Sequence, residues 1–269
     1  MDLSQIKLVV MDMDGTLLNS KSEVSDQFFN LYQKLTKHEI HFVAASGRQY
    51  HSIIDKLATI KDDITIIAEN GAFVVQKDKE LAKINLPLQR VLELIPILRN
   101  IDNIYYTLCG KKSAYIETYN DEFITILKEY YSEYQFVKDL TKVKDDDFFK
   151  IAVYHFESSE KYIYPAVKHF EKIMQVKVSG EHWVDISEPN ANKGYALQLV
   201  QDRLGIGVNE TMVFGDYNND LEMLRLAHFS YAMENAHPNV KKEARFQTKS
   251  NDRGGVEEIL EKLLNAKIS

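Results

Sequence analysis

The strongest constraint on the fold is an alternation of short apolar runs with amphipathic segments in the first third of the chain. Residues 6–11 (IKLVVM), 40–46 (IHFVAAS) and 64–72 (ITIIAENGA) are largely apolar and rich in β-branched side chains, as are strands buried on both faces. Residues 25–39 and 52–60 lie between them and repeat apolar residues at helical spacing. This order predicts right-handed βαβ units and a parallel sheet.

The alternation stops in the middle of the chain and resumes later. Ten of the fifteen tyrosines lie between residues 101 and 165, in a region that mixes helix-like and strand-like segments. From residue 194 the pattern of buried strands and helices returns. We therefore expect an α/β protein with a Rossmann-like parallel sheet core, residues 1–83 and 185–269, and an inserted α+β domain, residues 84–184.

The composition narrows the choice of partners and location. Lys and Arg number 33 against 40 Asp and Glu, a net charge of −7 without a dense basic block, so nucleic acid and anionic membranes are poor partners. Cys109 is the only cysteine, which fits a reducing cytosol and excludes an intrachain disulfide. With no secretory leader and no run of ~18 apolar residues, we expect a soluble, cytoplasmic protein. No self-complementary apolar stripe is evident, so we expect a monomer.

Polar residues collect where the expected core strands end, and ligands of open parallel sheets bind beyond the carboxyl ends of the strands. Taken singly, each of these residues could be a helix cap, a turn residue or a solvated charge. Four such groups at successive strand ends are harder to explain in that way. They are Asp12, Asp14, Gly15 and Thr16; Ser46 and Gly47; Lys193; and Asp216, Asn219 and Asp220.

A calcium-binding loop is an alternative explanation for the first group, DMDGT. Glu23 falls at the twelfth position counted from Asp12, as such a loop requires. However, Gly15 stands at the fourth position where the loop needs glycine at the sixth, and the preceding segment is strand-like where a helix is needed. The sequence therefore disfavours a calcium loop.

The four groups suit the chemistry of a phosphate ester. A carboxylate that attacks a phosphate dianion meets a repulsion of about 4 kcal/mol per pair of unit charges at 4 Å. The acidic residues Asp12 and Asp216, with Asp220, offer oxygen ligands for Mg²⁺, and Lys193 adds a second positive charge. The Ser46 hydroxyl and the backbone N–H groups after it can hold phosphoryl oxygens. A carboxylate is then able to act as a nucleophile and form an aspartyl-phosphate.

The same motifs carry a family resemblance. DMDGTLL, ASGR, NKG and GDYNND, in this order and with a long insert between the second and the third, resemble the four motifs of the haloacid dehalogenase superfamily of phosphatases. AENGA, MENAHPNVKKEA and NDRGGV resemble the Cof-like subfamily with a type IIB α/β cap. The stretches SGRQYHSI, CGKKSAYI and SGEHWVDI are most similar to its bacterial sugar phosphatases. The resemblance covers essentially the whole chain.

The resemblance implies a role for each motif residue. Asp12 would be the nucleophile, and Asp14 the general acid and base. The Asp12 carboxylate, the Asp14 backbone carbonyl and Asp216 would ligate Mg²⁺. The remaining residues would bind the metal directly or through water (Asp220), or contact the phosphoryl group or substrate (Ser46, Gly47, Lys193 and Asn219). Glu234 stands where the family commonly has glycine, which affects a local turn and the charge near the metal.

The inserted domain would then be a cap that excludes water and selects the substrate through its loops. The candidate loops are residues 111–113 and 180–182, whereas Trp183 and the tyrosines are favoured as cap core.

We expect a Mg²⁺-dependent phosphomonoesterase for small phosphorylated metabolites, with sugar phosphates preferred and a nucleotide, flavin or pyridoxal phosphate as alternatives. A phospho-accepting signalling module needs neither Asp14 nor a cap. A phosphomutase or phosphonate hydrolase stays open within the fold, and a dehalogenase is disfavoured because the second aspartate serves a phosphate leaving group.

Overall fold

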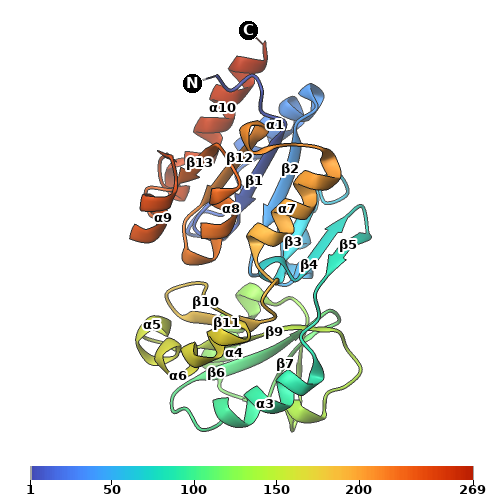
Figure 1. The fold of residues 1–269 in the computed structure, drawn as a ribbon, viewed down its shortest axis with the longest axis vertical. Helices are drawn as coiled ribbons and strands as arrows, with labels where there is room; N and C mark the ends of the chain where they lie inside the picture. The colour runs from blue at the N-terminus through green and yellow to red at the C-terminus, as the bar shows by residue number, and fades with distance from the viewer. Residues whose placement is uncertain (1, 269) are drawn as a thin grey trace.

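The computed structural model describes residues 2–268, in which the strands form two sheets, one above the other in Figure 1. The larger sheet has eight strands in the order β14-β13-β12-β1-β2-β3-β4-β5. Its six parallel strands are β1 (Leu8–Asp12), β2 (His41–Ala45), β3 (Thr65–Ala68), β12 (Thr211–Gly215), β13 (Phe229–Ala232) and β14 (Phe246–Gln247). The α/β class and the parallel core sheet are confirmed.

Helices connect or flank the parallel strands of the core. They are α1 (Asp26–Leu35), α2 (Tyr50–Lys56), α7 (Lys193–Leu204), α8 (Leu221–Arg225), α9 (Pro238–Glu243) and α10 (Gly255–Ile268). Helix α1 packs beside α10, and α7 beside α8. Helix α7 begins sharply because the Asn192 side chain accepts from Tyr195 N at 2.8 Å, which fixes the position of Lys193 in the first turn.

An antiparallel hairpin, β4 (Phe73–Gln76) and β5 (Lys79–Lys83), extends the core sheet beyond β3 and was not expected from the sequence. Its turn residues Lys77 and Asp78 have φ values of 49° and 57°, which such a turn usually obtains from glycine or asparagine. Strand β5 is mostly exposed and lacks an apolar face. Neither usual hairpin signal is therefore present in the sequence.

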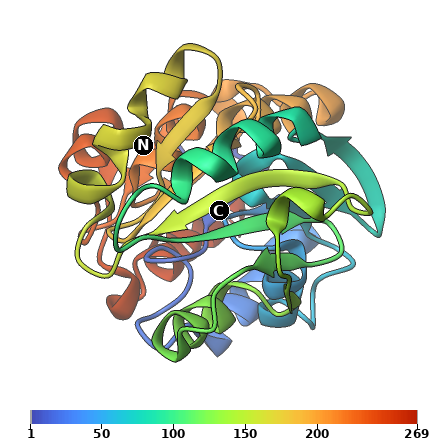
Figure 2. The same cartoon turned by 90° about the horizontal axis from the view of Figure 1, so that it is seen from below.

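The second sheet is built from residues 105–187, in the order β10-β11-β9-β6-β7-β8. Its strands are β6 (Tyr105–Gly110), β7 (Ala114–Ile116), β8 (Tyr134–Phe136), β9 (Phe148–Tyr154), β10 (Gln175–Val178) and β11 (Trp183–Ser187). The helices around it are α3 (Leu88–Leu98), α4 (Asp121–Tyr130), α5 (Ser159–Tyr162) and α6 (Tyr164–Val167). Helix α3 lies on the side away from the core, as Figures 1 and 2 show.

Two helices are short, and one of them ends before the helical pattern predicted for it. Helix α2 ends at Lys56 rather than at residue 60. Helix α4 ends at Tyr130, because Tyr131 is extended and β8 then pairs with β7. Strand pairing in the second sheet thus overrides local helical periodicity.

The two sheets have separate apolar clusters. The core cluster comes from residues 3–75 and 191–264, with Phe149 as the one buried member from the second sheet, stacked on Phe73 at 5.2 Å. The other buried clusters come from residues 86–186. This separation supports our proposal that residues 84–184 form an inserted cap domain.

The chain leaves the core for the second sheet and later returns to it. Both connecting segments contact the same turn of the core, at Gly71 and Ala72. Ile84 N donates to Ala72 O at 2.8 Å on the way out. On the way back, Asn192 lies against Gly71, where an added Cβ would stand 2.3 Å from the Asn192 carbonyl oxygen. Gly71 also has φ = 99°, so both its backbone and its surroundings require glycine.

Candidate active site

The groups at the strand ends come together around one cavity between the two sheets. The cavity has a volume of about 310 Å³, and its lining includes Asp12, Asp14, Ser46, Gly47 and Asn219 from the core. Asp12 ends β1, Ser46 follows β2, and Asn219 follows β12. The parallel register of β1 with β2 and β12 therefore brings the first, second and fourth motifs to one edge of the sheet.

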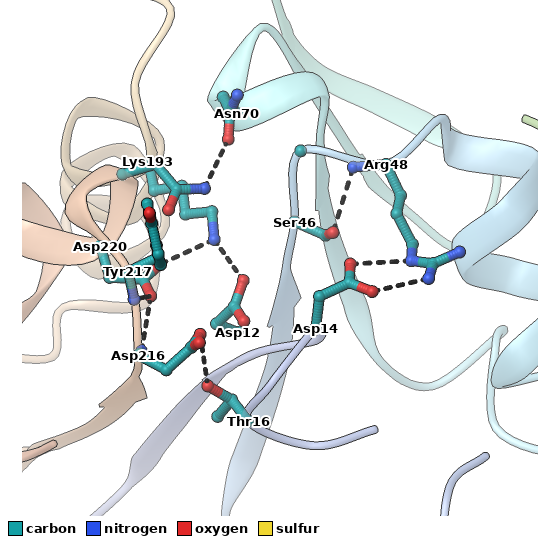
Figure 3. A network of polar contacts seen from close by, with 12 residues as sticks. Asp12, Asp14, Thr16, Ser46, Arg48, Asn70, Lys193, Asp216, Tyr217 and Asp220 are labelled. Carbon is teal, nitrogen blue, oxygen red and sulfur yellow. Dashed lines mark hydrogen bonds and ion pairs between the residues drawn. The ribbon is translucent and has the colours of Figure 1, made fainter. Parts of the chain in front are cut away.

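Lys193 joins the third motif to the first and the fourth. Its Nζ donates to Asp12 Oδ1 and, at 2.7 Å, to Asp220 Oδ1, and its side chain is completely buried (Figure 3). Asp220 Oδ2 accepts from the backbone N of Asp216 at 2.9 Å and of Tyr217 at 3.1 Å. Asp220 thus uses both oxygens to orient Lys193 and the loop after β12.

Three carboxylates in this cluster provide an oxygen donor set that fits a divalent cation. Asp12, Asp216 and Asp220 each place a carboxylate oxygen within 4.8 Å of the others. Burial raises the pKa of Asp12 to about 7, with repulsion from Asp220 and Asp14 adding to the effect and Lys193 opposing it. Burial and repulsion from Asp12 and Asp220 also raise the pKa of Asp216 well above its ordinary value. The three carboxylates carry more negative charge than the single Lys193 ammonium can neutralise. Mg²⁺ would supply the further positive charge.

Gly15 is required by this arrangement. Its φ is +73°, and a Cβ added to it would stand 2.4 Å from Asp216 Oδ2. The neighbouring Thr16 hydroxyl donates to Asp216 Oδ1 at 3.2 Å. The glycine of the first motif therefore lets the backbone after β1 approach the acidic cluster.

Asp14 pairs with a different cation from the one that pairs with Asp12. Arg48 donates to Asp14 through Nε at 2.8 Å and through Nη2 at 2.6 Å, as Figure 3 shows. Met13, between the two aspartates, is completely buried, and the Asp14 side chain is 39% exposed against 7% for Asp12. The two carboxylates thus reach the same cavity in different electrostatic settings.

Arg48 was not among the residues selected from the sequence, although it closes the ASGR motif. Its Nη1 also donates to Glu129 O of α4, and its guanidinium lies 4.6 Å from the ring centre of Tyr130. Arg48 therefore connects Asp14 directly to helix α4, which packs on the second sheet. Asn70 of the AENGA stretch was also missed, and its side-chain oxygen accepts from Asn219 Nδ2 at 3.0 Å.

The structure separates the two loops that were candidates for substrate selection. Residues 180–182 line the cavity, but of the described residues that do so none comes from 111–113. Lys111 instead pairs with Glu80. Trp183, which the sequence favoured as core of the inserted domain, packs against an apolar cluster of the second sheet and also lines the cavity.

Glu234 adds little net charge near the acidic cluster. Its carboxylate pairs with Arg253 and accepts from Ser250 N at 3.3 Å, and its side chain is exposed. The neighbouring Asn235 donates to Gly15 O at 2.8 Å, so this turn still supports the first motif.

No helix within residues 2–268 combines the length and apolarity that a membrane crossing requires.

Comparison with known proteins places the chain among phosphatases. A family model described as haloacid dehalogenase-like hydrolase matches residues 9–260. The chain is 34% identical to the 5-amino-6-(5-phospho-D-ribitylamino)uracil phosphatase YbjI of Escherichia coli over 265 residues, 96% of both chains.

Solved structures with the same fold include a Streptococcus mutans protein with a TM-score of 0.91 at 29% identity, covering 97% of this chain and 99% of that one. A sugar phosphatase of haloacid dehalogenase subclass IIB aligns with a TM-score of 0.81 at 20% identity, covering 95% and 98%. At that identity the likeness concerns the fold.

Proposed function

Because the chain belongs to the haloacid dehalogenase-like hydrolases and is a phosphatase of that family, we propose that it hydrolyses small phosphorylated metabolites with Asp12 as nucleophile and Mg²⁺ as cofactor. One observation carries the proposal. Asp12 and Asp14 open into one cavity, but Lys193 holds the first and Arg48 holds the second. Two carboxylates in different settings suit two different roles in one reaction.

The reaction divides into two displacements at phosphorus. In the first, the Asp12 carboxylate forms a bond to phosphorus, the bond to the leaving oxygen breaks, and Asp14 gives its proton to that oxygen. In the second, Asp14 takes a proton from a water molecule, whose oxygen attacks the phosphorus and releases inorganic phosphate and Asp12. Ser46 and Gly47 bind the phosphoryl oxygens throughout.

Positive charge makes the attack on a dianion feasible. Lys193 is held against Asp12 and offsets part of the repulsion between carboxylate and phosphate. Mg²⁺, when bound by Asp12, Asp216 and the backbone carbonyl of Asp14, would supply further charge stabilisation. Because both Asp220 oxygens already accept hydrogen bonds, we assign Asp220 to the positioning of Lys193 and to metal contact through water.

Replacing Asp14 by Asn is expected to have an effect that depends on the leaving group. An alkyl phosphate needs a proton on its leaving oxygen, so kcat/KM should fall by about 10²–10⁴-fold. p-Nitrophenolate leaves without a proton, so the loss in its first turnover should be much smaller. Water activation is still impaired, which should give a burst of p-nitrophenolate in rapid-mixing experiments.

Asp202→Asn is the matched control, because Asp202 lies on α7 and pairs only with a surface glutamine in the structure. An equal loss for both leaving groups in the first turnover would remove Asp14 from the acid role.

For the substrate, we propose a polyol phosphate joined to a planar ring. Tyr130 and Trp183 line the cavity with their rings 5.5 Å apart, next to Glu181 and His182, whose polar atoms suit hydroxyl groups. The name of the Escherichia coli relative describes such a molecule, with a phosphorylated ribityl chain on a uracil. The sequence alone favours sugar phosphates, and a ring-bearing polyol phosphate replaces that preference because of the aromatic lining.

The ring makes the substrate proposal testable with Trp183→Leu. We expect kcat/KM for 5-amino-6-(5-phospho-D-ribitylamino)uracil to fall about tenfold, the scale of one lost stacking contact. A hexose 6-phosphate, which has no planar ring, should change by less than about twofold, so the ratio between substrates cancels any loss of folded protein. A wild-type enzyme that prefers the hexose phosphate contradicts the proposal.

A further inference from the structure

In the loop after β2, the backbone carbonyl groups of three successive residues, 46–48, each accept a hydrogen bond. Ser46 O accepts from Asn70 N at 2.9 Å, and Arg48 O accepts from Glu69 N at 3.1 Å. Both donors belong to the core turn after β3. Gly47 O accepts from Lys150 Nζ at 2.6 Å, and Lys150 lies on β9 of the second sheet. The middle carbonyl therefore depends on the cap, whereas its two neighbours depend on the core.

The Gly47 carbonyl belongs to the same peptide plane as the Arg48 N–H. In a trans peptide these two groups point in opposite directions, so fixing one fixes the other. Arg48 N donates to Ser46 Oγ at 3.1 Å. Since Ser46 Oγ accepts there, its own O–H is left to donate elsewhere, which suits a phosphoryl oxygen. The hydrogen bond from Lys150 to Gly47 O thus fixes the peptide, and the Arg48 N–H on the other side of that peptide orients the Ser46 hydroxyl.

Lys150 is almost completely buried, and its ammonium lies among three oxygens of the protein. Besides Gly47 O, its Nζ contacts Asp185 Oδ1 at 3.1 Å and Glu69 Oε2 at 3.3 Å. The contact with Gly47 O has hydrogen-bond geometry, whereas Asp185 and Glu69 face the ammonium as counter-charges in ion pairs. Burial lowers the pKa of Lys150, but Asp185 and Glu69 outweigh this and raise it above its ordinary value. Lys150 therefore stays charged, and at the wall of the cavity its hydrogen bond to Gly47 O acts on the loop.

The counter-charges of Lys150 come from the core turn after β3 and from the second sheet. Glu69 belongs to the core and Asp185 to β11 of the cap, and Asn70 Nδ2 donates to Asp185 Oδ2. Glu69 and Asn70 have φ values of 51° and 55°, a conformation that costs energy for residues other than glycine and persists only where the surroundings hold it. The turn, the cap strand and the phosphate-binding loop are thus one connected structure.

We propose that Lys150 is a positioning residue that completes the phosphate-binding loop from the cap, by fixing the Gly47–Arg48 peptide and through it the Ser46 hydroxyl. The proposal rests on the proposed function. It assigns the cap a part in phosphoryl transfer itself, in addition to substrate choice. Every phosphorylated substrate should depend on Lys150 to the same degree, because the loop binds the group that all of them share.

The test uses Lys150→Met in a charge-balanced background. The single variant leaves Glu69 and Asp185 buried without their cation, so it is combined with Glu69→Gln, which gives the pair the same net charge as the wild type. We expect kcat for this double variant to fall roughly 10- to 100-fold, the scale of a small misplacement of catalytic groups. The factor should be equal for p-nitrophenyl phosphate and a hexose 6-phosphate, and the inhibition constant of inorganic phosphate should rise.

Two controls isolate the effect. Glu69→Gln alone keeps Lys150 and should stay within about threefold of wild type in kcat. Lys177→Met removes another lysine that joins cap to core, through Glu222, away from the loop, and should behave likewise.

Wild-type kcat in the double variant would overturn the proposal, because charge balance alone would then explain Lys150. A loss that differs between the two substrates would also overturn it, because Lys150 would then act on the leaving group. Failure of the proposed function is seen separately, as a wild-type protein without turnover. In that case the affinity for inorganic phosphate, measured by calorimetry, still tests Lys150, and equal affinities in wild type and double variant would overturn its role.

Discussion

Asp12→Asn is expected to lower kcat for p-nitrophenyl phosphate by about 10⁵-fold or more, the scale seen when an enzyme loses its nucleophile. The amide has nearly the same shape as the carboxylate but cannot attack phosphorus. Because Asp12 is buried and is repelled by Asp220 and Asp14, its replacement also removes an unfavourable interaction. Lys193 keeps Asp220 as a partner. The thermal midpoint of the variant should therefore equal or exceed that of wild type.

Two measurements separate lost chemistry from lost structure. Steady-state assays at high enzyme concentration give the residual rate, and calorimetry gives the midpoint. The Asp202→Asn protein controls for an Asp-to-Asn change on the surface. Residual turnover within about tenfold of wild type would exclude Asp12 as the nucleophile, since general acid and base catalysis alone contributes 10²–10⁴-fold.

Removal of divalent metal is expected to lower hydrolysis by about 10³-fold or more, with recovery on addition of Mg²⁺. The reason is the charge of the cluster, in which Asp12, Asp216 and Asp220 face one ammonium. A phosphate dianion would add to that negative charge. Mg²⁺ prefers such oxygen donors and would offset the carboxylate repulsion that, together with burial, raises the pKa of Asp216.

Metal binding should also be visible without turnover. A ligand that binds the folded state at a hundred times its Kd adds about 2.7 kcal/mol to the free energy of unfolding, so Mg²⁺ should raise the thermal midpoint of metal-free wild type. Asp216→Asn should weaken this rise, and Glu234→Gln should leave it intact because Glu234 pairs with Arg253. Full activity after exhaustive chelation would refute the metal requirement.

The parallel core could be predicted because its strands are buried on both faces. The segments around β1, β2, β3, β12 and β13 are almost continuously apolar, and this pattern is visible without any knowledge of contacts. The hairpin of β4 and β5 could not be predicted, because its turn residues Lys77 and Asp78 have positive φ values although neither is a glycine or an asparagine. The pairing of β4 with β3 stabilises the hairpin despite its unfavourable turn residues.

The site was predictable where a residue's type and its place at a strand end both mattered, as for Asp12 and Lys193. Arg48 and Lys150 escaped because their roles depend on which groups they meet in the folded chain, Asp14 and Gly47, and not on a place directly after a core strand. The only sequence signal for Lys150 is a single charge inside the otherwise apolar run FFKIAVY. A buried lysine in such a strand needs counter-charges, which only the folded structure identifies.

The close approach of both chain crossings to Gly71 and Ala72 has a consequence for how such a protein can change over evolutionary time. When an inserted segment leaves and re-enters the core at one turn, only that turn has to accommodate it. The entropy of closing a loop grows slowly, by about 0.6 kcal/mol for each doubling of its length. The core can therefore accept inserts of very different size and shape at this turn while the sheet that carries Asp12 remains unchanged. New substrate preferences then become accessible by exchange of one segment, with the glycine at the junction as the residue that cannot vary.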